Sequence, residues 1–243
     1  MLYQARPGQY SYGEAIGILL LESPAPFIPG DVANATTYNF PVRFKKVPGL
    51  TVERIFNHDL SLVDSVIEAA LDLKANGVRA ISGDCGFMAI YQKHLSGVLN
   101  LPVFMSSLLQ VAFINNLLAE KAKIGIITAN AAALDSTVLK PCGAYLPERT
   151  AIRGLEKRPH FRAAFIEEKG TLDSNAVEEE VLSTARQLIK DVPEVRALLL
   201  ECSVLPPYSA ALQQATGLPV FDYVTMINYV YSAVVKQRFK GFM

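Results

Sequence analysis

One stretch of this sequence occurs twice, and that repeat constrains the fold more than any other feature. Shifting the chain by 117 residues aligns residues 78–104 with residues 195–221 without a gap, and 10 of the 27 aligned positions are identical. Chance matching would give about two identities at ordinary residue frequencies. A duplicated structural unit is the better explanation, so we expect two similar halves.

Apolar runs alternate with helical patterns along both halves, which is typical of parallel βα units. Buried strands are predicted, four in each half, at residues 15–21, 52–56, 78–83, 101–104, 123–128, 150–154, 195–200 and 218–221. Helices are predicted at about 60–75, 107–120, 175–190 and 223–237, the last of them capped by Asp222. The predicted fold class is therefore α/β, with two lobes of four strands each.

Two cysteines occupy equivalent positions of the repeat. Cys85 and Cys202 each follow an acidic residue, Asp84 or Glu201, where a predicted strand ends. Open α/β sheets bind ligands at that edge. A thiol on each side of a cleft can remove a proton from one face of a carbon and return one to the other face. A cysteine can also be a small buried hydrophobe, but the repeat and the strand-end position favour catalysis. Cys142 has no counterpart and is interpreted as structural.

The residues after each of the two cysteines are predicted to enter a turn that leads into a helix. The backbone amides there belong to Gly86 and Phe87 in one half and to Ser203 and Val204 in the other. Amides at such a turn can bind a carboxylate or a developing enolate oxygen. We therefore treat these four residues as candidates for substrate binding.

Two other regions contain candidate binding residues. Thr128 and Asn130 lie at the carboxyl end of the fifth predicted strand, where their side chains could join the same pocket, although ordinary turn residues would look identical. The segment from residue 22 to residue 50 contains five prolines and directly follows the first strand. A loop of that length is usually a lid, a binding loop or an interface arm. The sequence leaves the lid and the dimer arm as equal alternatives.

The charge balance excludes several classes of partner. Lys and Arg together number 23, Asp and Glu also number 23, and the pI is about 6.8. No overall field is available to hold a nucleic acid or a charged membrane surface. The chain has no apolar run of about 20 residues and its start does not resemble a signal peptide, so a cytoplasmic location is expected.

Motifs for metals and nucleotides are also missing from the sequence. No CxxC pair occurs, and His58, His94 and His160 lie far apart, so a zinc ribbon is not expected. Neither a GxGxxG nor a GxxxxGK[ST] string is present, so a nucleotide cofactor is not indicated.

The chain resembles the aspartate/glutamate racemase superfamily. The resemblance lies in GDCGF at residues 83–87, in LLECSVLPPY at residues 199–208 and in the duplicated lobes. It implies two pseudo-symmetric lobes, each a four-stranded parallel sheet flanked by helices, with a site between the lobes, no cofactor and no metal. It also implies that the last helix returns to the first lobe. The first lobe would then comprise residues 1–116 and 222–243, and the second lobe residues 117–221.

The chain departs from the amino-acid racemases of that superfamily at three places. Those enzymes typically follow the first cysteine with Asn-Thr and the second with Thr-His, whereas Gly-Phe and Ser-Val stand here. Their Asp-Ser after the first strand is missing at the expected place, although Glu22 and Ser23 lie slightly later and are taken as candidates. The pattern looks closer to hydantoin or allantoin racemase, maleate isomerase and arylmalonate decarboxylase. Those decarboxylases keep only the second cysteine, so two cysteines favour isomerisation.

Three functions follow as hypotheses. The first is a cofactor-independent racemase or isomerase of a small carboxylate, amino acid or cyclic amide, with Cys85 and Cys202 as opposed acid and base. The second is a lyase of the decarboxylase type with Cys202 as the sole proton donor. The third is a non-catalytic small-molecule binding protein. A homodimer is expected from the family resemblance and from the mean hydropathy of +0.24.

Overall fold

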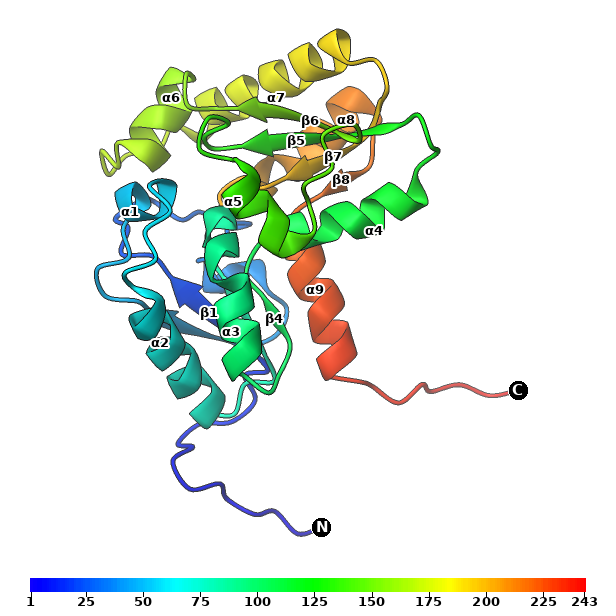
Figure 1. The fold of residues 1–243 in the computed structure, drawn as a ribbon. Coiled ribbons are helices and arrows are strands. Elements are labelled where there is room, and N and C mark those ends of the chain that lie inside the picture. The colour runs from blue at the N-terminus through cyan, green and yellow to red at the C-terminus, as the bar shows by residue number, and fades with distance from the viewer.

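The computed structural model describes residues 1–243 and contains two four-stranded sheets, one in each lobe (Figure 1). Every neighbouring pair of strands is parallel. The first sheet has the order β2-β1-β3-β4 and the second the order β6-β5-β7-β8, so the two lobes share one topology. The predicted α/β class is confirmed. The strands are β1 (Ile16–Leu20), β2 (Val42–Lys46), β3 (Ala80–Gly83), β4 (Val103–Phe104), β5 (Lys123–Thr128), β6 (Thr150–Gly154), β7 (Val195–Leu200) and β8 (Val220–Phe221).

Helices flank both sheets, and the four predicted ones correspond to α2, α4, α7 and α9. Shorter 3₁₀ helices lie at Ala35–Thr37, Gly86–Tyr91, Ser107–Leu109, Lys140–Cys142 and Pro206–Tyr208, and a π-helix at Arg162–Ile166. The α-helices are α1 (Val52–Phe56), α2 (Val63–Ala75), α3 (Gln92–Val98), α4 (Gln110–Leu117), α5 (Ser136–Leu139), α6 (Pro159–Phe161), α7 (Ser174–Asp191), α8 (Ser209–Thr216) and α9 (Tyr223–Val234).

The second predicted strand is wrong. Residues 52–56 form helix α1, whose first turn is capped by the Thr51 side chain accepting a hydrogen bond from the Arg54 amide. The second strand of the sheet is β2, inside the segment that the sequence presents as one long loop. β2 is an edge strand of half-buried residues, VRFKK, paired only with β1. Charged side chains are common on such an edge, so β2 lacks the apolar run of a central strand.

The last helix joins the two lobes. Asp222 caps α9, as predicted, by accepting a hydrogen bond from the Thr225 amide at 2.7 Å. From there α9 crosses back to the first lobe (Figure 1), where Tyr223 and Ile227 pack among buried residues of the first sheet, such as Ile18. The Tyr223 hydroxyl also donates to the Met105 carbonyl at 2.8 Å. No helix is long and apolar enough to cross a membrane.

Candidate active site

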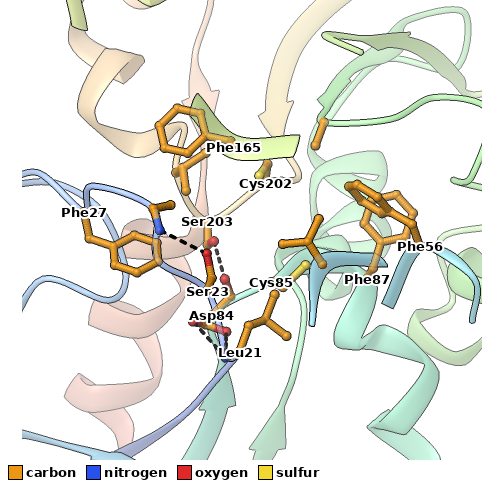
Figure 2. A pocket seen from close by; sticks show the side chains of 14 residues that line it. Leu21, Ser23, Phe27, Phe56, Asp84, Cys85, Phe87, Phe165, Cys202 and Ser203 are labelled. Carbon is orange, nitrogen blue, oxygen red and sulfur yellow. Dashed lines mark hydrogen bonds between the residues drawn. The ribbon is translucent and has the colours of Figure 1, made fainter. Parts of the chain in front are cut away.

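The two cysteines meet because β3 and β7 end at the same level of their sheets. One residue beyond each strand, the Asp84 amide donates to the Leu19 carbonyl at 3.0 Å and the Glu201 amide to the Ile127 carbonyl at 2.8 Å. The chain then turns, and the next residues are Cys85 and Cys202. Figure 2 shows both sulfur atoms beside one cavity between the lobes.

This cavity is small and mainly apolar. Its volume is about 40 Å³, and 11 of its 14 lining residues are hydrophobic. Four of them are phenylalanines. The lining residues are Leu21, Ser23, Ala25, Phe27, Val52, Phe56, Asp84, Cys85, Phe87, Ala129, Phe165, Cys202, Ser203 and Val204.

Six of the ten residues that the sequence singled out line the cavity. Cys85 and Phe87 reach it from the first lobe, and Ser23 reaches it from the segment after β1. Cys202, Ser203 and Val204 reach it from the turn after β7. Ser23, Ala25 and Phe27 also place part of the long segment after β1 against the cavity, as a binding loop would be.

The other four lie outside it. Thr128 is fully buried and donates a hydrogen bond to the Glu201 carboxylate at 2.8 Å. Asn130 accepts hydrogen bonds from the Ala132 and Ala133 amides, which is an ordinary turn. Glu22 is exposed and pairs with a lysine of β2. Gly86 packs directly against the Glu201 carboxylate.

The acid before each cysteine ties two strand ends together. Both Asp84 carboxylate oxygens accept from the Leu21 amide, at 3.0 and 3.2 Å. The Glu201 carboxylate accepts from Thr128 and from the Ala129 amide at the corresponding place in the second lobe. Burial raises the pKa of Asp84 and of Glu201 to about 7. Glu201 Oε1 is buried and has no hydrogen-bond partner.

Two serine hydroxyls form hydrogen bonds between the lobes. The Ser203 hydroxyl donates to the Asp84 carbonyl of the first lobe. The Ser107 hydroxyl shares its hydrogen between the Leu200 carbonyl at 2.9 Å and the Glu201 carbonyl at 3.1 Å. The Glu201 side chain also crosses, because its carboxylate occupies the space that a Cβ atom on Gly86 would need. The backbones around both thiols are thus held from the opposite lobe.

The two thiols differ in accessibility and share one electrostatic environment. Cys85 is buried and Cys202 is partly exposed. Burial raises the pKa of the Cys85 thiol well above its ordinary value, and the nearby Cys202, Glu201 and Asp84 raise it further. Burial and then Glu201 raise the pKa of the Cys202 thiol in the same direction. The Phe87 and Val204 amides oppose these shifts, each at its own cysteine. Both thiols are therefore protonated at neutral pH in the empty site.

Two contacts between the lobes hold aromatic walls of the cavity. The Ser23 hydroxyl donates to Glu168, which follows the π-helix that carries Phe165. His58, which follows Phe56, has its Nε2 atom 2.9 Å from the Ala133 carbonyl.

Glu168 and His58 are also the only non-glycine residues with positive φ, at 50° and 53°. Backbone strain of this kind and π-helical turns both gather at functional sites. The two bridging contacts therefore begin at residues whose backbone conformation is unusual.

Most of the apolar walls of the cavity could not be predicted from the sequence. Three phenylalanines that line the cavity, Phe27, Phe56 and Phe165, cannot be distinguished in the sequence from aromatic residues of the core. Phe27 lies in the proline-rich segment directly after β1, and this position was the one available pointer. No group of three or more His, Cys, Asp or Glu side chains is arranged to hold a metal ion.

Known proteins resemble this chain in sequence along most of its length, although no family model matches it. It is 32% identical over 222 residues to dimethylsulfoniopropionate lyase from Durusdinium sp. clade D, covering 88% of this chain and 73% of that protein. The chain belongs to the dimethylsulfoniopropionate lyase family. Dimethylsulfoniopropionate lyase 6 from Emiliania huxleyi (strain CCMP1516) is 33% identical over 235 residues, covering 91% of this chain and 60% of that relative. The chain thus spans between three fifths and three quarters of the length of these two lyases.

Solved structures place the fold of this lyase family member in the predicted superfamily. Allantoin racemase from Pseudomonas fluorescens has a TM-score of 0.61 at 18% identity, covering 94% of this chain and 99% of that one. Picrophilus torridus aspartate racemase has a TM-score of 0.60 at 16% identity, covering 94% and 96%. The resemblance to the aspartate/glutamate racemase superfamily is confirmed at the level of the fold.

The predicted racemase or isomerase activity is contradicted, because the sequence relatives are named lyases. The lyase hypothesis is favoured instead, although it specified decarboxylation, which those names do not mention. The physical reason for the error is that two thiols across a cavity do not define stereoinversion. Removing a proton next to a carboxylate begins both inversion and elimination, and a leaving group on the neighbouring carbon selects elimination. That group belongs to the substrate and leaves no trace in the pattern of cysteines.

Proposed function

We propose that this chain is a dimethylsulfoniopropionate lyase, which splits its substrate by β-elimination. The observation that carries the proposal is the pair of thiols beside a small apolar cavity, in a chain that belongs to this lyase family. The substrate is a small carboxylate, one of the three classes that the sequence left open, with a sulfonium leaving group on the β-carbon. A mainly apolar cavity suits such a reaction because it limits the number of water molecules near the reacting atoms.

The elimination moves one proton and breaks one carbon–sulfur bond. A thiolate removes the proton from the carbon next to the carboxylate, and the electron pair of that C–H bond becomes the second bond of the C=C double bond. The bond from the β-carbon to sulfur breaks, and both of its electrons go to sulfur. The products are dimethyl sulfide and acrylate, and the proton stays on the cysteine until water removes it.

Cys202 is the better candidate for the base. It is partly exposed whereas Cys85 is buried, and the acids Glu201 and Asp84 oppose the ionisation of both thiols. Cys85 then stays a thiol on the other side of the cavity, where it can donate a hydrogen bond to the charge that develops on the substrate. The amide of Ser203, beside the base, is the proposed anchor for the substrate carboxylate.

The purified chain tests this proposal directly. Incubated with dimethylsulfoniopropionate, it should release dimethyl sulfide, measured in the headspace by gas chromatography, and an equal amount of acrylate, measured by NMR. Cys202→Ser should lower the rate on the order of a hundredfold or more, because an alcohol is a far weaker acid than a thiol. Cys142→Ser is the matched control, since Cys142 lies outside the cavity lining. A wild-type chain that releases no dimethyl sulfide would refute the proposal.

The homodimer and the cytoplasmic location stay predictions. Light scattering at micromolar concentration checks the first, and a monomer there would contradict it.

A further inference from the structure

The charges around the cavity are of one sign. Among its 14 lining residues Asp84 is the only acid, and there is no Lys, Arg or His. Asp31 and Glu201 are buried close to the thiols, since both raise the pKa of Cys202. Burial also raises the pKa of Asp31 well above its ordinary value. These raised pKa values leave the acids partly protonated, but the lining contains no basic group that would repel a ligand carrying positive charge.

Basic side chains near the cavity are engaged elsewhere. Lys46 lies in an open groove that adjoins the cavity, where it pairs with Glu22 at 2.7 Å. His58 contacts Phe87 but lies outside the cavity lining, and its Nε2 atom is bonded to the Ala133 carbonyl. Neither side chain therefore neutralises the acids from within the cavity.

Phenyl rings stand on two sides of the thiols. Figure 2 shows Phe56 and Phe87 on one side of the sulfur atoms. Phe27 and Phe165 lie on the other side, where Ser23 and Ser203 also line the cavity. The Phe56 and Phe87 ring centroids are 4.9 Å apart, with their planes at 78°, so the two rings form a corner. Cations that carry methyl groups, such as sulfonium and quaternary ammonium, bind to aromatic rings through cation–π attraction.

We propose that the corner formed by Phe56 and Phe87, with Val52 beside it, binds the onium group of the substrate. The carbon chain then lies between the two thiols, and the carboxylate points to the side where Ser203 lines the cavity. This inference rests on the proposed lyase function and adds the residues that select the substrate. It makes the site selective for zwitterions with a methylated cation over acids of the same shape that lack the cation.

A cation at this corner also affects the ionisation of the two thiols. In the empty site burial keeps both cysteines protonated. A positive charge that arrives with the substrate favours the thiolate, because opposite charges at close range stabilise the ionised form. A bound cation therefore lowers the cost of losing the thiol proton to water, whereas a ligand without a cationic group does not.

Two unreactive probes of nearly the same shape test the proposal. One is the trimethylammonium analogue of dimethylsulfoniopropionate, and the other is its tert-butyl analogue, in which carbon replaces the positively charged atom and only the carboxylate charge remains. Isothermal titration of the wild-type chain should show the cationic probe binding about tenfold more tightly than the tert-butyl probe. Phe56→Leu should reduce that ratio to about threefold or less, while Phe56→Trp should keep it. Phe113→Leu is the control, because Phe113 lies on α4, outside the cavity, and is exposed.

The outcomes separate this inference from the proposed function. Equal binding of the two probes, or no binding of either, overturns the inference. So does a ratio that survives Phe56→Leu unchanged. If dimethyl sulfide is released from its precursor but the probes bind equally, only the onium site is wrong. If the cationic probe is preferred but no dimethyl sulfide is released, the onium site stands and the lyase function fails.

Discussion

The two turns that carry the cysteines share one backbone plan and differ in their side chains. In both lobes the acid before the cysteine ties its strand to the neighbouring central strand, and in both lobes a serine from the opposite lobe donates to the carbonyl of that acid. In the second lobe the residue after the cysteine, Ser203, is itself such a donor. In the first lobe the equivalent residue is Gly86, and Ser107 of a separate 3₁₀ helix donates instead.

The difference follows from one side chain. The Glu201 carboxylate fills the space beside Gly86, so no side chain can stand there, and the hydroxyl must come from Ser107. Asp84 is one methylene shorter and turns to the Leu21 amide of its own lobe, which leaves room for Ser203. The duplication therefore gives both lobes the same backbone arrangement. The two positions after the cysteines differ, because a glycine in one lobe makes room for the glutamate of the other. The two cysteines also differ, since Cys202 is more exposed than Cys85.

The largest expected effect concerns the two thiols. Cys202→Ser should lower the rate of dimethyl sulfide release on the order of a hundredfold or more, and Cys85→Ser about tenfold, because only Cys202 is the proposed base. Initial rates measured by gas chromatography at saturating substrate check the ratio. Equal losses in the two variants would mean that both thiols take part in moving the proton.

The second prediction tests the space beside Gly86. Gly86→Ala should destabilise the protein by about 3 kcal/mol, because the new methyl group meets the buried Glu201 carboxylate. Urea unfolding followed by circular dichroism measures the loss. Adding Glu201→Asp, which shortens the acid, should recover part of it, so the two changes should be non-additive. Additive losses would show that the contact does not set the identity of residue 86.

The third prediction uses the pH dependence of stability. The pKa of Glu201 and of Asp84 is about 7 in the folded chain and ordinary in the unfolded chain, so the folded chain binds these protons more tightly. The resulting stabilisation is present at low pH and is lost as pH rises through about 7. The glutamine in Glu201→Gln cannot ionise. The free energy of unfolding of this variant should therefore fall by roughly 2 kcal/mol less than that of wild type between pH 5 and pH 8. Parallel stability curves for the two proteins would contradict this.

The smallest effects are expected at the two serines. Ser203→Ala and Ser107→Ala should each destabilise the protein by about 1 kcal/mol, because each removes one buried hydrogen bond between the lobes. Thermal melts should show similar decreases in Tm, about 2 to 4 °C each. A much larger decrease for one serine would show that the two crossings are not equivalent.

The sequence predicted the fold class and the position of the cysteines because both depend on a repeat that is visible in one dimension. It failed at β2, whose charged edge hides it, and at residues 52–56, whose apolar positions also fit one helical turn. The residues that line the cavity could not be predicted from the sequence for another reason. Phe56 on α1 and Phe165 on the π-helix come from different lobes and meet only after the lobes pack. Whether such a phenylalanine faces a cavity or a core depends on tertiary structure, which one sequence without relatives does not reveal.

The contact between Gly86 and Glu201 also limits how this molecule can change over generations. A protein built from two copies of the first lobe would leave a void where Glu201 lies, and one built from two copies of the second lobe would set a serine against a buried glutamate. Neither symmetric ancestor can be restored by exchanging halves, because each half now carries the complement of the other. A substitution at residue 86 is accepted only together with one at residue 201, so these two positions should vary as a pair among descendants of the duplicated chain.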